Sequence, residues 1–328
     1  MAKLKDMLVL LLRISISVLL LVFLFKFNKI DIRSLINDIK DTDKLFLTIG
    51  FAVLFASYVL GFLRWRMLLN AAGINIPLKR LISSFSGGVF FSIFLPSTIG
   101  GDFVRTVDLA DHTKKAKEVI ATVFLDRLSG YIGLVCVILP SLFLGRNLVL
   151  DRVVISSVSI ITLVLILVLL ILFNNTIYSK ITKFLSAPGA GKIKETIKNM
   201  HQEIHVFRYR KKTIAGNLLV SFFIQLINPI SVYFIGLSLG VRIDFIYFLI
   251  FLPMIGAITL LPIAAGGLGL REGLFVLYFA KAGVIKQLAL AMSILSFSSV
   301  VLYGAIGGLI YVLTIHHRRI QSNQSSSV

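Results

Sequence analysis

Long apolar runs constrain this chain more than any other feature of its sequence. A helix needs about 20 apolar residues to cross the hydrocarbon core of a bilayer. Of the 328 residues, 57% are hydrophobic and only 15% are charged, a balance that excludes a soluble globular domain. We therefore predict an all-α polytopic membrane protein, with 1–328 as a single integral membrane domain. Six full spans are expected, at about 7–27, 45–70, 119–145, 153–173, 213–237 and 288–314.

The charge distribution predicts orientation rather than nucleic-acid binding. The net charge is +19, and the excess lies in short loops beside apolar runs, where orientation and anionic lipid head groups explain it. Lys3, Lys5 and the basic loop 174–212 are predicted to be cytoplasmic, and the connection 26–44 to lie outside. The expected protein is multi-pass in the plasma membrane (a cell inner membrane), with both termini cytoplasmic and 317–328 a disordered tail.

A repeated motif interrupts two further apolar stretches, 81–95 and 245–261. Both copies fit L-P-x-x-x-G-G-x-x-x-R, one over 95–105 and one over 261–271, and the separation between the copies is the same at the proline and at the arginine. Proline ends a helix, and glycine permits backbone angles that other residues avoid. The helix-break residues are Pro96, Gly100 and Gly101 in the first copy and Pro262, Gly266, Gly267 and Gly269 in the second.

In hydrocarbon, a broken helix is tolerated only where it is buried in protein or lines a wet cavity. We therefore predict two re-entrant broken-helix hairpins. If the first hairpin opens to the cytoplasm, the three spans between the two hairpins bring the chain to the outside before the second hairpin begins. The two hairpins then open to opposite sides, which predicts inverted half-repeats at about 1–150 and 151–316. The alternative is chance similarity between two short motifs.

Charged residues follow each break. A helix N-terminus beside an arginine suits an anionic head group, because its N–H groups and the guanidinium both donate hydrogen bonds. Asp102 sits where an N-cap is expected, and Arg105 shares its helical face. Arg271 and Glu272 occupy the equivalent turn of the second copy. The alternative for the first copy is a solvated interfacial helix.

Of the charges inside predicted spans, three are candidate site residues: Arg64, Asp126 and Arg127. Asp126 begins seven residues into its span, about 10 Å deep at 1.5 Å per residue. Charges at that depth face a polar cavity or pair with another helix. Both interpretations stay open. Other features of the spans indicate helix contacts: Gln225, Asn228 and the G-x-x-x-G of Gly304 and Gly308.

Other chemistry finds no support in the sequence. His201 and His205 are one turn apart but do not form H-E-x-x-H, which needs glutamate directly after the first histidine. There is no P-loop and no nucleophile elbow. No metal, cofactor or catalytic residue is therefore expected, and any transport is passive, gradient-driven or driven by a partner.

Several of these motifs carry a family resemblance. They are Gly61-Phe62-Leu63-Arg64-Trp65-Arg66, Leu95-Pro96 through Gly100-Gly101-Asp102 and Arg105, Leu125-Asp126-Arg127, and Leu261-Pro262 through Gly266-Gly267 and Arg271-Glu272-Gly273. With these pieces in the same order over nearly its whole length, the chain resembles the flippase-like membrane family. That family includes the N-terminal membrane part of lysylphosphatidylglycerol synthases.

The resemblance implies lipid translocation. In the two-part synthases this membrane part is associated with moving an aminoacylated phospholipid between leaflets, and a separate C-terminal domain makes the lipid. This sequence carries no counterpart of that domain. The implied partners are therefore membrane phospholipids with anionic head groups and a separate lipid-synthesising enzyme, with no nucleic acid. Relatives are also linked to hopanoid and glycolipid pathways, so the resemblance does not identify the lipid that this chain would move.

Three hypotheses follow. In a lipid flippase-like transporter, Arg105 and Arg271 hold an anionic head group, and Asp126 and Glu272 accept a cationic part. The alternative is a membrane-embedded transferase, or its subunit, that modifies lipid head groups and is related to phosphatidylglycerol lysyltransferase. The third is a scaffold for a lipid-modifying complex.

Overall fold

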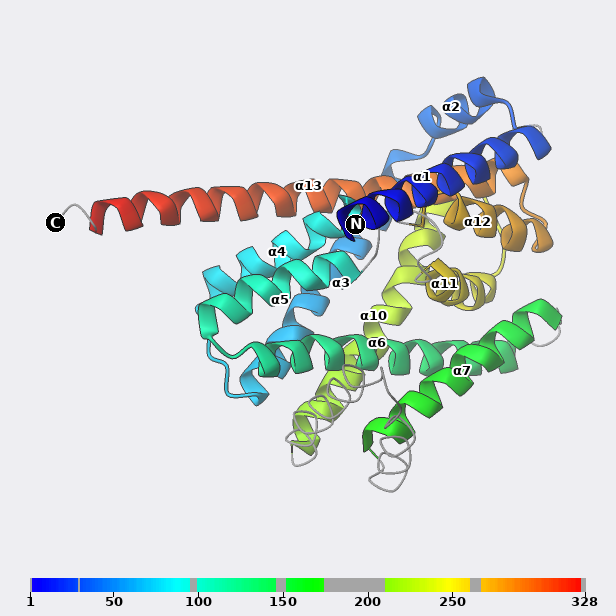
Figure 1. Ribbon diagram of the computed structural model, residues 1–328. Helices are drawn as coiled ribbons and strands as arrows, with labels where there is room; N and C mark the ends of the chain where they lie inside the picture. The colour runs from blue at the N-terminus through cyan, green and yellow to red at the C-terminus, as the bar shows by residue number, and fades with distance from the viewer. Residues whose placement is uncertain are drawn as a thin grey trace. The chain divides into compact units, whose positions relative to one another are not determined.

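The computed structural model describes residues 2–28, 30–94, 99–145, 152–173, 210–259 and 267–325. Every regular element in these ranges is a helix (Figure 1). The helices are α1 (Ala2–Phe27), α2 (Ile32–Lys40), α3 (Lys44–Ala71), α4 (Leu78–Phe94), α5 (Ile99–Thr113), α6 (Ala116–Leu144), α7 (Arg152–Phe173), α10 (Lys211–Ser238), α11 (Phe245–Thr259), α12 (Leu270–Lys281) and α13 (Lys286–Ser325).

Four helices in the described part of the chain are long and apolar enough to cross a membrane. They are Lys44–Ala71, Ala116–Leu144, Lys211–Ser238 and Lys286–Thr314. These four coincide with four of the predicted spans, which confirms the all-helical membrane class. The other two predicted spans fall in α1 and α7, whose described apolar parts, Ser15–Phe27 and Val158–Leu170, are shorter. The total of six spans stays a prediction.

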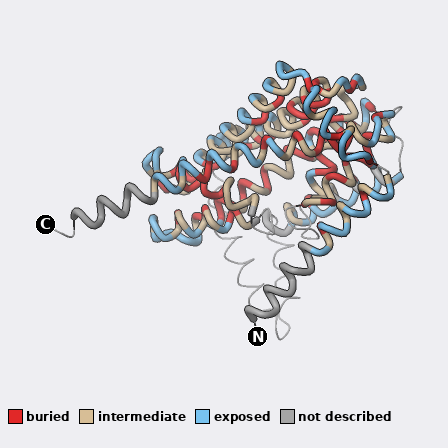
Figure 2. Tube along the Cα trace, turned by 90° about the horizontal axis from the view of Figure 1, so that it is seen from above, coloured by how far each residue is buried: buried red, intermediate tan, exposed pale blue. Residues whose placement is uncertain are grey.

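The spans keep large apolar side chains on their outer surfaces. Leu19 is 67% exposed and Phe23 61% exposed on α1, and Leu163 is 58% exposed on α7. Figure 2 shows such exposed positions along the outer sides of the helices. Soluble proteins rarely present apolar surface this extensive, whereas a lipid-facing surface requires it.

The chain forms two compact units. Unit 1 contains Met1–Tyr58, Pro77–Arg105 and Ile227–Val328, and unit 2 contains Val59–Ile76 and Thr106–Leu226. The boundaries fall inside α3, α5 and α10. Both copies of the repeated motif therefore belong to unit 1, although they come from different predicted half-repeats. The division into half-repeats stays a prediction.

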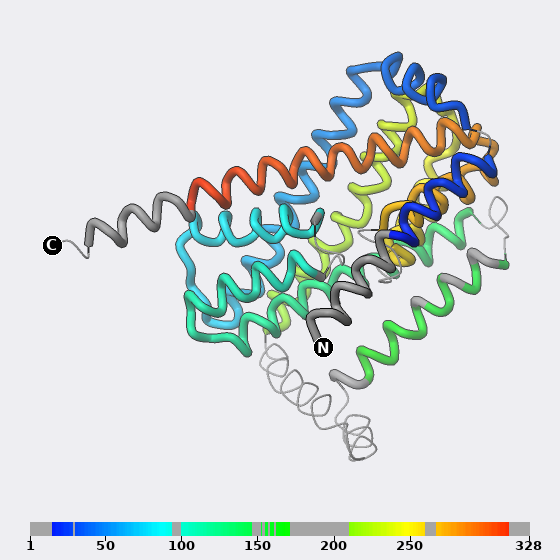
Figure 3. Tube along the Cα trace, turned by 45° about the horizontal axis from the view of Figure 1, so that its top comes forward, coloured from blue at the N-terminus to red at the C-terminus, as the bar shows by residue number. Residues whose placement is uncertain are grey.

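In unit 1, α4 and the start of α5 form the first hairpin, on either side of residues 95–98. The Ser84 hydroxyl donates to the Arg105 carbonyl at 3.3 Å, and a Cβ added to Gly101 would clash with the Gly88 carbonyl oxygen. Contacts that pair 84 with 105 and 88 with 101 make the helices antiparallel, as Figure 3 shows. Glycine at both positions lets the two backbones touch.

The second hairpin, α11 with α12, is held by aromatic rings instead. Phe248 and Phe279 have ring centroids 5.0 Å apart, and those of Phe251 and Tyr278 are 5.4 Å apart. These contacts are also antiparallel, because moving forward along α11 means moving back along α12. Gly267 has a φ of +74°, a left-handed conformation that favours glycine.

The helix-break residues are described in part. Pro96, Pro262 and Gly266 lie outside the described residues. Gly100 and Gly101 lie in the first turn of α5, and Gly269 is the residue that precedes α12, with a φ of +81°.

Helix α13 packs against both hairpins in unit 1. A Cβ on Gly304 would clash with the Ile93 side chain of α4, and one on Gly308 would clash with the Phe90 side chain of the same helix. This confirms the close helix contact predicted from the glycine spacing. About 10 Å earlier along α13, at 1.5 Å per residue, Phe297 lies under Arg271 of α12.

Unit 2 packs the second part of α3 with α6, α7 and the first part of α10. Its buried leucines are Leu68, Leu125, Leu128 and Leu165. A Cβ on Gly133 would lie 2.8 Å from the Ser221 backbone, so α6 and α10 approach closely at this glycine. That approach brings the polar side chains of three helices together.

Candidate functional site

The first hairpin places a buried ion pair on α5. Arg105 Nη2 lies 2.8 Å from Asp102 Oδ1, and the two residues are only 5% and 7% exposed. The guanidinium also lies 5.9 Å from the Phe85 ring centroid, on α4. The prediction of Asp102 as an N-cap is wrong, because α5 begins three residues earlier, at Ile99. Its carboxylate instead pairs with the arginine one turn further along the helix.

The second hairpin places an equivalent pair at the start of α12. Arg271 Nη2 and Glu272 Oε1 form an ion pair, and Glu272 is 4% exposed. The Arg271 guanidinium lies 4.1 Å from the Phe297 ring centroid and its Nε donates to the Ser293 hydroxyl at 3.4 Å. A cation over an aromatic face is attracted to it, so the planar group is held from two sides.

Glu272 has a second role in the same hairpin. Its Oε2 accepts the backbone N–H of Gly269 at 2.6 Å. This is the acidic half of a capping box, in which a side chain three residues into the helix satisfies a backbone donor that has no partner within the helix. One carboxylate therefore both caps α12 and pairs with Arg271.

The two motifs thus build similar clusters. Each positions an arginine and a carboxylate within the first two turns of the second helix, where the helix dipole also favours an anion. Among the described residues, the hydrogen bonds of Arg271 use Nε and Nη2, and a guanidinium has five N–H donors. The Arg271 cluster therefore has both charges of an ion pair and donor capacity beyond it.

Unit 2 contains a third ion pair, between Arg64 on α3 and Asp126 on α6. Arg64 Nε lies 2.7 Å from Asp126 Oδ1, and the two side chains are 11% and 5% exposed. Arg64 Nη1 donates to the Ser221 hydroxyl of α10 at 3.1 Å, and the Asn217 amide donates to the Arg64 carbonyl at 3.1 Å. Of the two open interpretations for Arg64 and Asp126, these contacts favour pairing between helices.

Further hydrogen bonds tie the same three helices. The Gln225 amide donates to the Gly130 carbonyl of α6 at 3.1 Å, which confirms its predicted role in a helix contact. The Trp65 indole donates to the Thr122 hydroxyl at 3.3 Å. Sequence reasoning missed Asn217 and Ser221, although these two and Gln225 recur every four residues on α10. That polar spacing could have identified the face.

Six of the seven predicted site residues therefore form three local ion pairs, two in unit 1 and one in unit 2. The seventh, Arg127, is half-buried beside Asp126 on α6. Within the part of the chain that the structure describes, no group of three or more His, Cys, Asp or Glu could hold a metal ion. His201 and His205 lie outside that part.

Apolar helices long enough to cross a membrane, two helical hairpins and ion pairs with buried carboxylates define a polytopic α-helical membrane protein with polar clusters inside its units. Residues 10–307 match the family model described as "Lysylphosphatidylglycerol synthase TM region", and the chain belongs to that family. This confirms the resemblance found in the sequence.

Curated relatives are similar over most of their length. A UPF0104 membrane protein of Pyrococcus horikoshii is 26% identical over 77% of this chain and 82% of its own. Two UPF0104 membrane proteins of Methanothermobacter thermautotrophicus are 24% identical over 83% of this chain and 85% of theirs, and 23% identical over 78% and 81%. No solved structure matches the chain.

Proposed function

We propose that the protein moves a polar-headed lipid, with a phospholipid as the leading candidate, between the leaflets of the membrane. The observation that carries the proposal is the pair of interrupted hairpins in unit 1. Each hairpin pairs an arginine with a buried carboxylate near the start of its second helix; Arg105 is buried and Arg271 is half-buried. Membership of a family described by a lipid synthase's membrane region supports a role that concerns lipids.

The ion pairs suit a charged lipid head group that must leave water. Arginine offers parallel N–H donors to phosphate oxygens, and the N-terminal N–H groups of a helix add to them. A buried charge is costly without a partner, so an empty site needs the carboxylate to neutralise the arginine. When a phosphate binds the arginine, the released carboxylate is available to a cationic part of the head group.

This exchange predicts the class of cargo. A lipid that carries both a phosphate and an amine replaces both halves of the Arg105–Asp102 or Arg271–Glu272 pair, and an anionic lipid replaces one half. The proposed partners are therefore membrane phospholipids, with anionic head groups foremost, supplied by a separate lipid-synthesising enzyme. The proposed location is the plasma membrane, with both termini in the cytoplasm.

The Arg64–Asp126 cluster takes a supporting role in this proposal. Arg64 is engaged by a carboxylate, a hydroxyl and, through its backbone, an amide, on two other helices of unit 2. Its side chain is thereby fixed in one orientation. We assign to it the packing of α3, α6 and α10, and head-group contact to the two clusters of unit 1.

Lipid redistribution in proteoliposomes tests the proposal. Labelled phosphatidylglycerol and phosphatidylethanolamine would be followed by quenching from one side, with wild type, Arg105→Ala and Arg271→Ala. Loss of a charge-assisted hydrogen bond is worth about 1.5–3 kcal/mol, so each variant is expected to slow redistribution by about tenfold or more. The exposed arginine Arg66 supplies a matched control, because Arg66→Ala removes the same group from outside the clusters.

A neutral double variant separates transport from folding. Arg271→Met with Glu272→Gln removes both charges and leaves no buried charge behind, so it is expected to fold and yet transport slowly. Wild-type rates in both single variants and in this double variant would remove the two arginines from the mechanism. Slowing by Arg66→Ala to the same extent would show that the effect is not specific to the clusters.

The transferase and scaffold alternatives are tested with the same preparation. Purified protein incubated with lipid and aminoacyl-tRNA or an activated sugar is expected to form no new lipid. A new lipid product would make head-group transfer, instead of lipid transport, the leading function. Co-purification with a lipid synthase, without lipid movement by the isolated chain, would favour the scaffold.

A further inference from the structure

Helix α2 is a short amphipathic helix between the membrane helices α1 and α3. The Asp31 carboxylate caps it by accepting the N–H groups of Arg33 at 3.3 Å and Ser34 at 3.1 Å. At about 100° per residue, its apolar residues fall within one sector of about 100°. The members of that sector are Ile32, Leu35, Ile36 and Ile39.

One side of α2 is fixed against α13 in unit 1. The Gln287 amide donates to the Ser34 hydroxyl at 2.7 Å and also to the Asp38 carboxylate. Leu35, on the adjoining part of the helix, is 4% exposed. These contacts set the rotation of α2 about its axis.

The rotation leaves half of the apolar sector uncovered. Ile32 is 59% exposed and Ile36 is 45% exposed, one turn apart on the same face. An exposed apolar side chain also stands at the end of the helix that precedes α2, where Phe27 of α1 is 72% exposed. Exposed apolar side chains thus occur both on α2 and at the end of α1 that precedes it.

The length of the connections restricts what can cover this face. Only three residues separate Lys40 from Lys44, the first residue of the span α3, and an extended residue reaches at most about 3.6 Å. The end of α2 therefore lies within about 15 Å of the span, at the depth of the lipid head groups.

Charge on α2 agrees with that depth. Arg33 and Lys40 are exposed and lie beside the isoleucines on the helix surface. Basic residues that border an apolar face are typical of helices lying in the interface of a membrane that contains anionic lipids.

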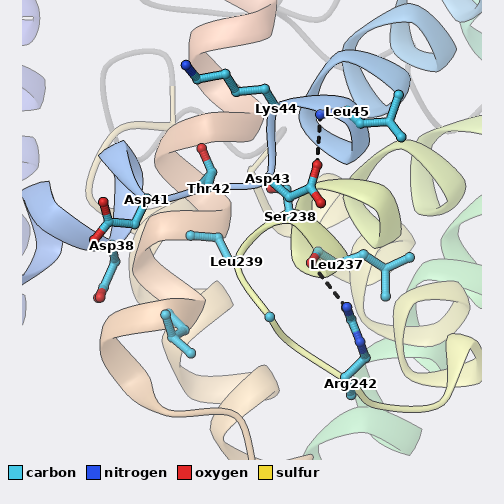
Figure 4. A pocket seen from close by; sticks show the side chains of 12 residues that line it. Asp38, Asp41, Thr42, Asp43, Lys44, Leu45, Leu237, Ser238, Leu239 and Arg242 are labelled. Atoms are coloured by element: carbon cyan, nitrogen blue, oxygen red, sulfur yellow. Dashed lines mark hydrogen bonds between the residues drawn. The ribbon is translucent and has the colours of Figure 1, made fainter.

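The polar edge of α2 borders a cavity that is lined by both charged residues and leucines. A cavity of about 730 Å³ is lined by Asp38 and Asp41 and by charged residues that include Asp43, Lys44 and Arg242. Figure 4 shows the two aspartates at the end of α2 on one side of it and Arg242 on the other. Water can fill a cavity that contains these charged residues. The side of α2 that carries Asp38 therefore suits water, and the side that carries Ile32 and Ile36 suits lipid.

From this arrangement we infer that α2 lies in the membrane interface and that lipid covers Ile32 and Ile36, at the boundary between head groups and acyl chains. The occupant of the face is the bilayer itself, and no protein partner is needed. This surface is independent of lipid transport, because none of its residues belongs to the ion-pair clusters.

Site-specific fluorescence tests the inference in the full chain. Cys136 is the sole cysteine, so Cys136→Ala gives a background in which Ile36→Cys carries one environment-sensitive label. Asn37→Cys is the matched control, one residue further along and about 100° around the helix. Both proteins would be placed in nanodiscs of phosphatidylethanolamine and phosphatidylglycerol.

The label at position 36 is expected to be shielded from aqueous iodide. Because an interfacial helix buries its apolar face only about 5–10 Å deep, lipids with a shallow nitroxide should quench at least about half of its emission. The label at position 37 should show the opposite preference. Arg33→Gln with Lys40→Gln should weaken the shielding at position 36 in anionic nanodiscs.

Two results would overturn the inference. Equal access of iodide to both labels in nanodiscs would show that no lipid covers the face. Shielding at position 36 in native membranes, but neither shielding nor nitroxide quenching in nanodiscs, would assign the face to a protein partner instead. Neither readout depends on lipid transport, so failure here leaves the proposed function untouched.

Discussion

The two hairpins of unit 1 share a sequence skeleton but are assembled by different forces. In the first, Gly88 and Gly101 bring the backbones of α4 and α5 into contact. In the second, aromatic rings of α11 and α12 pack against one another, with Phe251 1% exposed and Phe279 fully buried. The motif therefore places an arginine in the second arm of each hairpin, whereas the packing of the arms differs between the copies and depends partly on residues outside the motif, such as Gly88 and Phe251.

The glycine pair shows the same divergence at corresponding positions. Gly101 and Gly267 occupy the same place in the two copies of the motif. Gly101 lies within α5 and is needed for space, whereas Gly267 has a left-handed backbone and is needed for its conformation. One residue type meets two separate physical requirements.

The acidic partner also moves between the two copies. Asp102 precedes its arginine by three residues, and Glu272 follows its arginine directly. Either arrangement places a carboxylate against the guanidinium. The two copies therefore share the ion pair, but the acidic residue occupies a different sequence position in each.

The largest expected effect comes from removing an aromatic ring from the second hairpin. Phe251→Ala deletes the ring that contacts Tyr247, Tyr278 and Phe279, and such a cavity costs about 3–5 kcal/mol. Unfolding by SDS in mixed micelles measures the loss. Leu277→Ala is the control, because Leu277 lies on α12 and is 50% exposed. Equal losses in the two variants would contradict aromatic packing as the main force.

Next in size is the loss of the acidic partner in the second hairpin. Glu272→Ala removes both the ion pair with Arg271 and the cap of α12, and breaking a buried pair costs about 3 kcal/mol or more. Glu272→Gln retains an oxygen for the Gly269 N–H and should cost less. The same SDS titration distinguishes them, and identical losses would show that the cap contributes nothing.

The first hairpin should respond to added volume. Gly101→Ala forces a methyl group against the Gly88 carbonyl oxygen, and overpacking of this kind costs about 1–3 kcal/mol. Gly256→Ala on α11 is the control, because a Cβ there meets nothing within 4 Å. The midpoint temperature of thermal unfolding in detergent should be lower than that of the wild type in Gly101→Ala and unchanged in Gly256→Ala. An unchanged midpoint in Gly101→Ala would mean that the hairpin arms can separate freely.

The smallest effect is expected at the corresponding glycine of the second hairpin. A Cβ on Gly267 would sit 3.4 Å from the Thr259 side chain, an ordinary contact, so Gly267→Ala costs only the left-handed backbone, about 1 kcal/mol. Gly267→Asn should recover part of it, because asparagine tolerates that conformation better. A loss larger than that of Gly101→Ala would reverse the comparison of the two hairpins.

The fold was predictable where its signal is local. Sustained hydropathy along the sequence located α3, α6, α10 and the part of α13 up to Thr314 to within a few residues of their ends, but it did not indicate the continuation of α13 to Ser325. Helix α2 was missed, because it is too short for a span and lies in a connection, although its amphipathic spacing marks it. The interleaving of the units was not predictable, because it depends on contacts between distant segments.

The candidate site was predictable in its charges but not in its partners. Arg64 and Asp126 stand out because they are ionisable residues in apolar sequence. Their mutual contact, between residues far apart in the chain, is set by the packing of α3 on α6. Glu272 was identified by its charge, and its cap of Gly269 follows a spacing of three residues that was overlooked.

The interleaved course of unit 1 also bears on biosynthesis. Ile93 of the first hairpin finishes its packing against Gly304, and most of the chain is translated between these two residues. At about 5–20 residues per second, the nascent hairpin waits on the order of 10–40 s for its permanent neighbour. During that delay the surface of α4 that later packs on α13 must be covered by lipid or by the insertion machinery, so the fold is completed only when the last helix has left the ribosome.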